Sequence, residues 1–215
     1  FMKKILISSV LSASLLCVAN AQSSGLFVGV NAGVPITTPD YKGSLAATKD
    51  FFPTTGIGWA VGVDVGYKQA LSQNYGLKWY LSYNYNQSKG SKDSEAIGKS
   101  EADINQHLIT ANVDYYFNFT PAFGAYLGIG VGYQQYNPTW KMGGATIPTE
   151  GAKGGLAVPV NVGLTYNFND KNQILLGAKI PLVAYDYETN NPQTQTKGTA
   201  TLRTYIVQIG YNLTF

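Results

Sequence analysis

The chain has 215 residues, of which 13% are charged and 13% aromatic, and it contains 16 tyrosines and 24 glycines. Its charged fraction is well below the roughly 25% that is usual for soluble domains. Beyond the N-terminal segment, no continuous apolar run approaches the ~20 residues of a membrane-spanning helix, which excludes a helical membrane protein. Without Lys3 and Lys4 the chain carries 13 basic against 12 acidic residues. It therefore lacks the basic patch that nucleic-acid binding requires.

The N-terminus has the layout of a secretory signal peptide. Lys3 and Lys4 form its positive region, and residues 5–18 form its apolar region. The predicted cleavage site, a small-x-small motif followed by glutamine, comprises Ala19, Ala21 and Gln22. We therefore expect a signal peptide over residues 1–21 and one mature domain over residues 22–215.

The mature sequence alternates with the period of two that is typical of β-strands, and no stretch sustains the 3.6-residue apolar period of a helix. Polar or glycine-rich segments separate the alternating stretches. The pattern predicts eight strands, at residues 25–34, 57–69, 75–86, 106–117, 123–136, 156–168, 173–185 and 201–215.

The two faces of these strands indicate what surrounds them. In residues 57–68 the odd positions are bulky and apolar, whereas the even positions are Gly, Ala, Asp64 and Lys68. A water-soluble sandwich would expose charges opposite its core. We therefore expect the bulky face to meet lipid and the small face to line a narrow bore. Aromatic residues near the strand ends are expected to form the two interfacial girdles: Trp59, Tyr67, Trp79, Tyr85, Tyr115, Tyr133, Tyr166, Tyr185 and Tyr205.

Strands of about ten residues cross an outer membrane at the usual tilt, and lipid leaves unpaired backbone groups unsatisfied. The predicted fold class is therefore all-β, an eight-stranded antiparallel up-and-down transmembrane β-barrel. The connections alternate in length, which predicts short periplasmic turns and long surface loops. The short turns are at 70–74, 118–122 and 169–172, and the long loops are at 35–56, 87–105, 137–155 and 186–200. We expect the second long loop, which is polar, to be mobile.

The last strand carries large apolar side chains at alternate positions and ends on an aromatic residue: Tyr205, Val207, Ile209, Tyr211, Leu213 and Phe215. Together with the leader and the alternating segments, this pattern resembles the small eight-stranded outer-membrane barrels of Gram-negative bacteria, the family that includes the OmpA transmembrane domain and OmpX. The resemblance implies export through the inner membrane by the signal peptide and residence in the bacterial outer membrane. It also implies that the barrel-assembly machinery reads the last strand.

Four charged residues are predicted to face the bore at similar heights: Asp64, Lys78, Asp114 and Lys179. Isolated charges in a narrow bore are costly unless they are paired or hydrated, so we expect a buried salt-bridge cluster. Its structural role would be to plug and stiffen the barrel. Its alternative role would be a gate or an ion path.

Two residues near the outer rim are candidates for contact with lipid. Arg203 has lipid-facing parity, so its side chain either snorkels to lipopolysaccharide phosphates or is an exposed arginine at the base of a loop. His107 is the only histidine, and some barrels of this shape modify lipid A with histidine and serine. Here its same-face neighbour is Ile109, and Asp103 is expected in the mobile loop, so no catalytic residue is assigned.

The expected partners follow from the fold and the composition. Cys17, the only cysteine, lies in the expected leader, so the mature domain has no thiol for a disulfide or a metal. We expect neither a metal nor a cofactor. The expected partners are outer-membrane lipid and lipopolysaccharide, the barrel-assembly machinery, and host or surface ligands of the loops. We expect a monomer and no nucleic acid.

The sequence therefore predicts a non-enzymatic outer-membrane barrel that displays four long surface loops, with an envelope-structural or adhesin-like role. One alternative is a narrow passive pore, because inward glycines leave room for water. A weaker alternative is a lipid A-modifying enzyme. Bulky side chains are expected to occupy part of the bore: Tyr80, Leu108, Tyr116, Tyr126 and Leu175.

The terminal aromatic residue generates a prediction. Deleting Phe215 should lower the amount of barrel that assembles in the outer membrane, because the recognised strand loses its last side chain. The deletion should alter the unfolding midpoint of assembled barrels much less. Cell fractionation combined with heat-modifiability on gels measures both quantities. If the shortened chain assembled as well as the full chain, Phe215 would not be part of the assembly signal.

Overall fold

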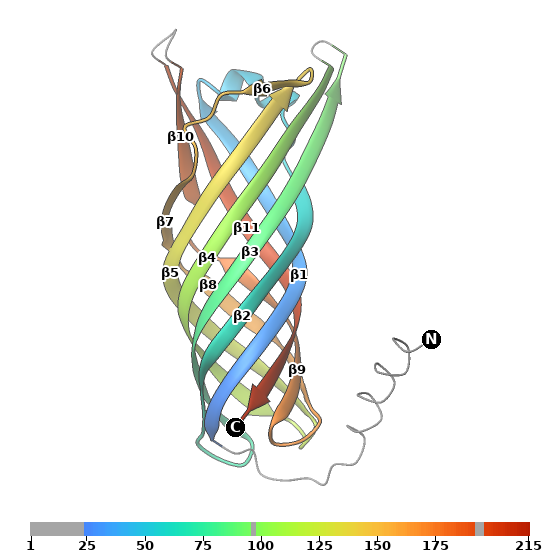
Figure 1. Ribbon diagram of the computed structural model, residues 1–215, viewed down its shortest axis with the longest axis vertical. Coiled ribbons are helices and arrows are strands. Elements are labelled where there is room, and N and C mark those ends of the chain that lie inside the picture. Colours follow the sequence, from blue (N-terminus) through green and yellow to red (C-terminus); the bar gives the residue numbers. More distant parts are fainter. Residues whose placement is uncertain (1–23, 96–97, 192–195) are drawn as a thin grey trace, which may run out of the picture.

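The computed structural model describes residues 24–95, 98–191 and 196–215, and it forms a tall closed β-wall (Figure 1). Eight antiparallel positions make up the ring, in the order β1-β2-β3-β4-β5-β8-β9-β11, and β11 pairs with β1 to close it. Because the ring is closed, each of these eight strands has a hydrogen-bonded neighbour on both sides. Lipid offers the backbone no other hydrogen-bond partner. The predicted eight-stranded up-and-down barrel is confirmed.

The strands differ greatly in length, and the hairpins on one end of the barrel are extended. Their bounds are β1 Gly25–Gly43, β2 Gly56–Ala70, β3 Tyr75–Ser94, β4 Gly98–Asn118, β5 Phe123–Met142, β6 Ala145–Ile147, β7 Lys153–Ala157, β8 Pro159–Asn167, β9 Asn172–Pro181, β10 Tyr185–Asn191 and β11 Thr196–Thr214. A short 3-10 helix, η1, spans Ala46–Phe51. Among the described residues, no helix has the length and apolarity needed to cross a membrane.

Most of the expected surface loops are sheet instead of loop. The β3–β4 ladder continues without interruption from Tyr75↔Phe117 up to Ser94↔Gly98. Likewise, β1 and β11 remain paired as far as Gly43↔Gly198. The prediction of a mobile loop at residues 87–105 is therefore wrong, because its alternating residues fit a pleated ladder as well as they fit a polar loop.

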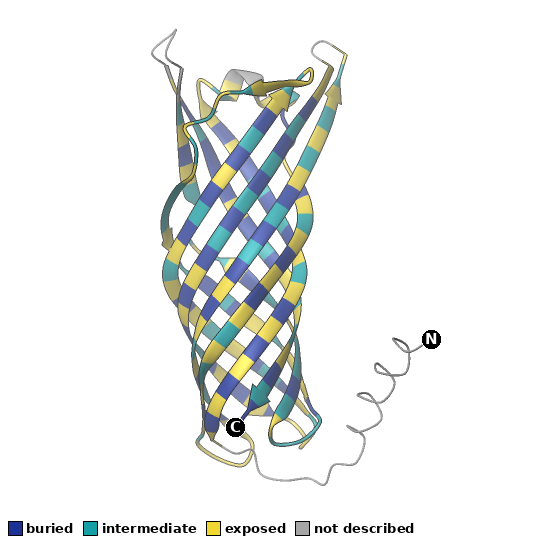
Figure 2. Cartoon of the chain, viewed as in Figure 1, coloured by how far each residue is buried: buried dark blue, intermediate teal, exposed yellow. Residues whose placement is uncertain are grey.

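The polarity of the wall inverts along β4. In its lower half the inward residues are polar, such as Asn112, and the outward residues are apolar, such as Val113. In its upper half the inward residues Ala102 and Ile104 are apolar and buried, while the outward Asp103 is charged. The strict burial alternation runs through both halves (Figure 2). The wall therefore leaves lipid near the middle of β4 and continues into water as a sheet with an ordinary inner core.

A hydrophobic cluster fills the inside of this upper sheet, which we call the outer core: Tyr41, Phe52, Ala102, Ile104, Tyr136, Trp140, Tyr187, Ala200 and Leu202. Phe52 directly follows η1 and packs its ring 5.6 Å from that of Tyr41. The Tyr41 hydroxyl donates to the Pro53 carbonyl at 3.0 Å. Burial raises the pKa of Tyr41 to about 12, as expected for a phenol in a dry site.

Two wall positions are broken, and prolines account for the breaks. The sixth position is formed by β7 and β8, which are separated at Val158, and the seventh is formed by β9 and β10, which are separated at residues 182–184. Pro159 and Pro181 are cross-strand partners at the break. Since proline has no N–H to donate, two prolines that face each other leave this pair without a ladder hydrogen bond. The continuous strands predicted at 156–168 and 173–185 are thus each interrupted.

Above the prolines, β7 and β10 are joined by side chains, and the described residues show no ladder between them. The Lys153 ammonium donates to the Glu188 carbonyl at 2.9 Å, and the Tyr187 hydroxyl donates to the Gly151 carbonyl at 2.6 Å. Tyr185, which was expected in a membrane girdle, instead stacks on Tyr136 at 5.8 Å. Odd-numbered residues face inward on both sides of the break, from Lys179 to Tyr187, so Tyr185 shares the inward parity of Lys179 and the girdle prediction for it is wrong.

The outer core generates a prediction. Replacing Trp140 with Ala should cost about 3–5 kcal/mol of local packing energy, because it empties the centre of the outer core. Trypsin should then cleave at Lys89, Lys99 and Lys141 on the upper sheet, while the membrane-embedded half stays protected. The matched control is Val131→Ala, which faces lipid. Unchanged protease resistance of Trp140→Ala would contradict the packing role.

Candidate functional site

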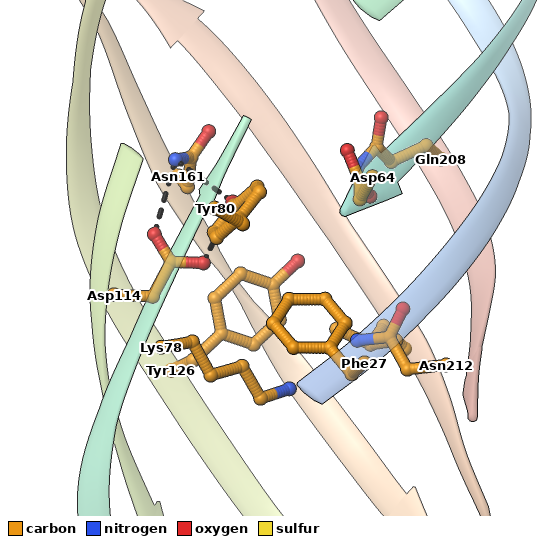
Figure 3. A pocket seen from close by; sticks show the side chains of 10 residues that line it. Phe27, Asp64, Lys78, Tyr80, Asp114, Tyr126, Asn161, Gln208 and Asn212 are labelled. Carbon is orange, nitrogen blue, oxygen red and sulfur yellow. Dashed lines mark hydrogen bonds between the residues drawn. The ribbon is translucent and has the colours of Figure 1, made fainter. Parts of the chain in front are cut away.

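Three of the four predicted interior charges lie close to one row across the wall. The register aligns Lys78 with Asp114, Asp114 with Gly128, Gly128 with Asn161, and Asn161 with Lys179. We call this set the interior polar row. It crosses strands β3, β4, β5, β8 and β9, and Figure 3 shows the side chains of Lys78, Asp114 and Asn161 in the bore.

Asn161 is the centre of the interior polar row. Its amide nitrogen donates to Asp114 Oδ1 at 3.1 Å, and its amide oxygen accepts from Lys179 Nζ at 3.3 Å. The Tyr80 hydroxyl donates to the other oxygen of Asp114 at 2.8 Å. Gly128 makes the first contact possible, because a Cβ there would stand 2.0 Å from Asp114 Oδ1. A neutral amide thus joins two opposite charges that do not touch.

Asp64 lies on the other side of the same cavity and has different partners (Figure 3). One carboxylate oxygen accepts from the Asn31 amide at 3.3 Å, and that amide's oxygen accepts from Asn84 at 2.8 Å. The other oxygen of Asp64 is buried without a protein partner, as is the amide oxygen of Gln208. Both residues line a cavity of about 20 Å³. That volume suits a single water, which would satisfy both oxygens.

Lys78 also bonds to an amide instead of a carboxylate. Its ammonium donates to Gln173 Oε1 and lies 5.9 Å from the centre of the Phe27 ring. Lys68 is its direct cross-strand partner, so two lysines stand side by side in the lower bore. Lys68 in turn lies over the Tyr116 ring at 5.5 Å. Cation–π contact and amide bonding therefore hold these charges.

The predicted buried salt-bridge cluster is corrected by this geometry. Within the described residues, ion pairs occur only above the membrane: Asp40–Lys42, Lys89–Asp103, Lys99–Glu101 and Glu150–Lys153. The four interior charges do share one region, and Lys179 interacts electrostatically with both Asp64 and Asp114. The sequence reasoning missed Asn31, Asn161 and Gln173. The sequence feature that could have identified them is an amide side chain at an inward-facing strand position. Such residues are depleted in strands and need a hydrogen-bond partner when they are buried.

A second polar layer closes the bore above the interior polar row. Thr37 and Thr204 are 2.9 Å apart through their hydroxyls, and Thr204 is 3.1 Å from the Tyr136 hydroxyl. Gln106 donates to that same hydroxyl at 2.9 Å, and Ser88 donates to Thr37 at 2.8 Å. These bonds connect β1, β11, β5, β4 and β3 across the lumen. Between the two layers lies an apolar cluster of Ala60, Leu108, Ala157 and Ile206.

The remaining predicted residues are spread over the wall. The large side chains of the last strand face outward, and the Phe215 amide donates to the Leu26 carbonyl at 2.8 Å. Arg203 is exposed opposite Thr38 on β1. His107 faces outward, with Nδ1 at 2.9 Å from the Tyr83 hydroxyl. The predicted cleavage residues Ala19, Ala21 and Gln22 lie outside the described residues, and the described part of the chain holds no group of three metal ligands.

The family of the chain follows from a comparison with known families. The outer membrane protein beta-barrel domain matches residues 8–215. The chain belongs to this family. The expected location is thereby confirmed, and the protein is an outer-membrane barrel of Gram-negative type. A search of curated proteins found no match.

Solved structures of other outer-membrane barrels are similar to this one in fold. Neisserial surface protein A is 15% identical, with a TM-score of 0.53, covering 90% of this chain and 100% of its own. OprG from Pseudomonas aeruginosa is 17% identical, with a TM-score of 0.52, covering 91% of this chain and 99% of its own. At such identities the likeness concerns the fold alone.

The amide bridge of this outer-membrane barrel is open to a direct test. Asn161→Leu keeps the volume but strands Asp114 and Lys179, so it should lower the free energy of unfolding by about 1–3 kcal/mol. Urea unfolding in lipid vesicles, followed by tryptophan fluorescence, measures the change. Adding Asp114→Asn should recover part of the loss, because the unpartnered carboxylate is removed. The lipid-facing Val162→Leu is the control, and equal stability of Asn161→Leu and Val162→Leu would refute the bridge.

Proposed function

We propose that this outer-membrane barrel is a closed envelope protein with a structural or surface-interaction role, and that it is neither a solute pore nor an enzyme. The filled bore is the observation that carries the proposal. The cavity beside the interior polar row has a volume of about 20 Å³, and the cavity beside Pro159 and Pro181 has about 10 Å³. Each has room for about one water, far less than a solute needs.

Several layers along the bore support the closed state. From the periplasmic side upward they are Lys68 over the Tyr116 ring, the interior polar row, the apolar cluster around Leu108, the Thr37–Thr204 layer and the outer core. An ion would have to break buried hydrogen bonds in two layers and cross two apolar layers, each of which disfavours a charge. The interior charges thus act in this proposal as a plug and not as a path.

The upper sheet supports a role at the cell surface. Its strands continue beyond the lipid as paired ladders except between β7 and β10, and the outer core braces them from inside. A surface held rigid in this way loses little conformational entropy when it binds a partner. The display role therefore falls on a stiff sheet instead of four long loops, and envelope components or host ligands are the proposed partners.

The surroundings of His107 favour a non-catalytic role. Its ring nitrogen is engaged by Tyr83, and Asp103 is bound to Lys89 at 3.1 Å and to Gln87 at 3.3 Å. A histidine base needs a nucleophile and an orienting acid in contact with it. The contacts of His107 instead resemble those of an interfacial aromatic residue.

Conductance in planar bilayers tests the closed state. The refolded barrel should give no channel openings above the baseline of protein-free membranes, because both polar layers span the lumen. A vesicle-swelling assay with small sugars should likewise show no protein-dependent entry. Steady single-channel openings at moderate voltage would overturn the proposal in favour of the narrow pore.

A further inference from the structure

A groove lies on the outward face of strands β3, β4 and β5 above the membrane. Its volume is about 440 Å³, more than twentyfold that of the cavity beside the interior polar row. Its polar and charged lining includes Lys89, Lys99, Glu101, Asp103, Asn105 and Lys141. We call it the outer groove. Its base is paired sheet, so its shape does not depend on a loop.

The outer groove holds three lysines and two carboxylates. Lys89 pairs with Asp103 at 3.1 Å, and Lys99 pairs with Glu101 at 2.7 Å. Glu101 raises the pKa of Lys99, and Lys99 lowers the pKa of Glu101, so both stay charged at neutral pH. Lys141 stands directly across from Glu101 in the β4–β5 ladder, but Glu101 is bonded to Lys99, and among the described residues Lys141 forms no ion pair of its own. The groove therefore presents a net positive charge together with carboxylate, amide and hydroxyl groups.

Aromatic rings form a patch directly below the outer groove. The Tyr85 ring lies 5.4 Å from Trp59 and 5.1 Å from His107, and His107 lies 6.2 Å from Tyr83. Hydrogen bonds join the patch to the groove. Tyr85 donates to Asn105 at 3.1 Å. Trp59 donates to Gln87 at 3.0 Å, and Gln87 donates to Asp103 at 3.3 Å.

The height of this surface limits what can reach it. The register places Tyr83 beside Val63 and Ile109, whose exposed apolar side chains belong to the lipid-facing half of the wall. The aromatic patch therefore lies at the outer lipid boundary, where amphipathic rings are favoured. The outer groove is directly above it, at the level of the headgroups of the outer leaflet.

We propose that the outer groove and the aromatic patch together bind the phosphorylated saccharide headgroup of a glycolipid anchored in the outer leaflet. Lys141, with Lys89 and Lys99, meets the phosphate as a charged donor. Asp103 and Asn105 accept from sugar hydroxyls, and the rings of Tyr85 and His107 pack on the apolar face of a sugar. The acyl chains continue down the stripe of Val63 and Ile109. The inference rests on the proposed surface role, and it names the partner of that surface.

The ligand is a membrane glycolipid and not a free sugar phosphate because the site is continuous with lipid. A soluble ligand would leave the aromatic patch and the apolar stripe below it unused. An anchored ligand gains from both and arrives at high local concentration. A phosphate-free glycolipid would leave the excess positive charge of the outer groove unbalanced.

Native mass spectrometry of the refolded barrel in detergent micelles tests the site. The probe is lipid A carrying phosphorylated inner-core sugars, with glucosamine 6-phosphate as the soluble comparison. Lys141→Gln should bind the glycolipid about tenfold more weakly, as expected for one charge-assisted hydrogen bond. The double variant Tyr85→Leu/His107→Leu should also bind more weakly, since leucine keeps the apolar surface but removes the ring faces. Glucosamine 6-phosphate should bind detectably less than the glycolipid.

Lys171→Gln is the matched control, because Lys171 is exposed in the short turn between β8 and β9, at the opposite end of the barrel from the outer groove, and the substitution removes the same single charge. Its affinity for the glycolipid should change little. Equal losses in Lys141→Gln and Lys171→Gln would show that binding follows net charge alone and would overturn the site. Wild-type barrel that fails to bind the glycolipid would overturn it as well. Neither result affects the conductance test, so the closed-barrel proposal is tested independently of the glycolipid site.

Discussion

Lipid offers the backbone no hydrogen-bond partner, and this constraint sets the wall of the barrel. Every strand in the membrane must have two neighbours, so β11 has to meet β1 along the whole crossing height. The same ladder then continues above the lipid, where water would have tolerated loops. Ring closure thus produces both the membrane-spanning barrel and the stiff sheet above it, and the same strands form both.

The inversion of polarity follows once the wall leaves lipid. A closed wall has only two faces, and burial alternates between them with every residue. In lipid the large apolar side chains belong outside, which leaves amides, hydroxyls and a few charges for the bore. In water the preference reverses, and Tyr41, Ile104 and Trp140 turn inward to form the outer core. The bore is therefore closed twice, by a polar network below and by an apolar core above.

The sequence predicted the parts of this fold that depend on which residue types occupy each face of a strand. Alternation in residues 57–68 revealed which side met lipid, and the inward parity of Asp64, Asp114 and Lys179 was correct. It could not separate loop from ladder at 87–105, since a polar alternating stretch suits either. Pro159 and Pro181 are visible in the sequence, but they interrupt the strands because they lie opposite each other. That pairing is a property of the register, which no single strand reveals.

The amide bridge shows why the direct ion pairs did not form. Asp114 and Lys179 are three strands apart in their row, about 14 Å along the wall at roughly 4.8 Å per strand. A carboxylate on one methylene cannot cover that distance, and Lys78, the direct cross-strand neighbour of Asp114, bonds to Gln173 instead. Asn161 divides the distance with a group that accepts at one end and donates at the other. Gly128 keeps the route open, because any side chain there would occupy the space of the carboxylate. A barrel this narrow therefore holds its interior charges with amides and glycines, residues that sequence reasoning about charge overlooks.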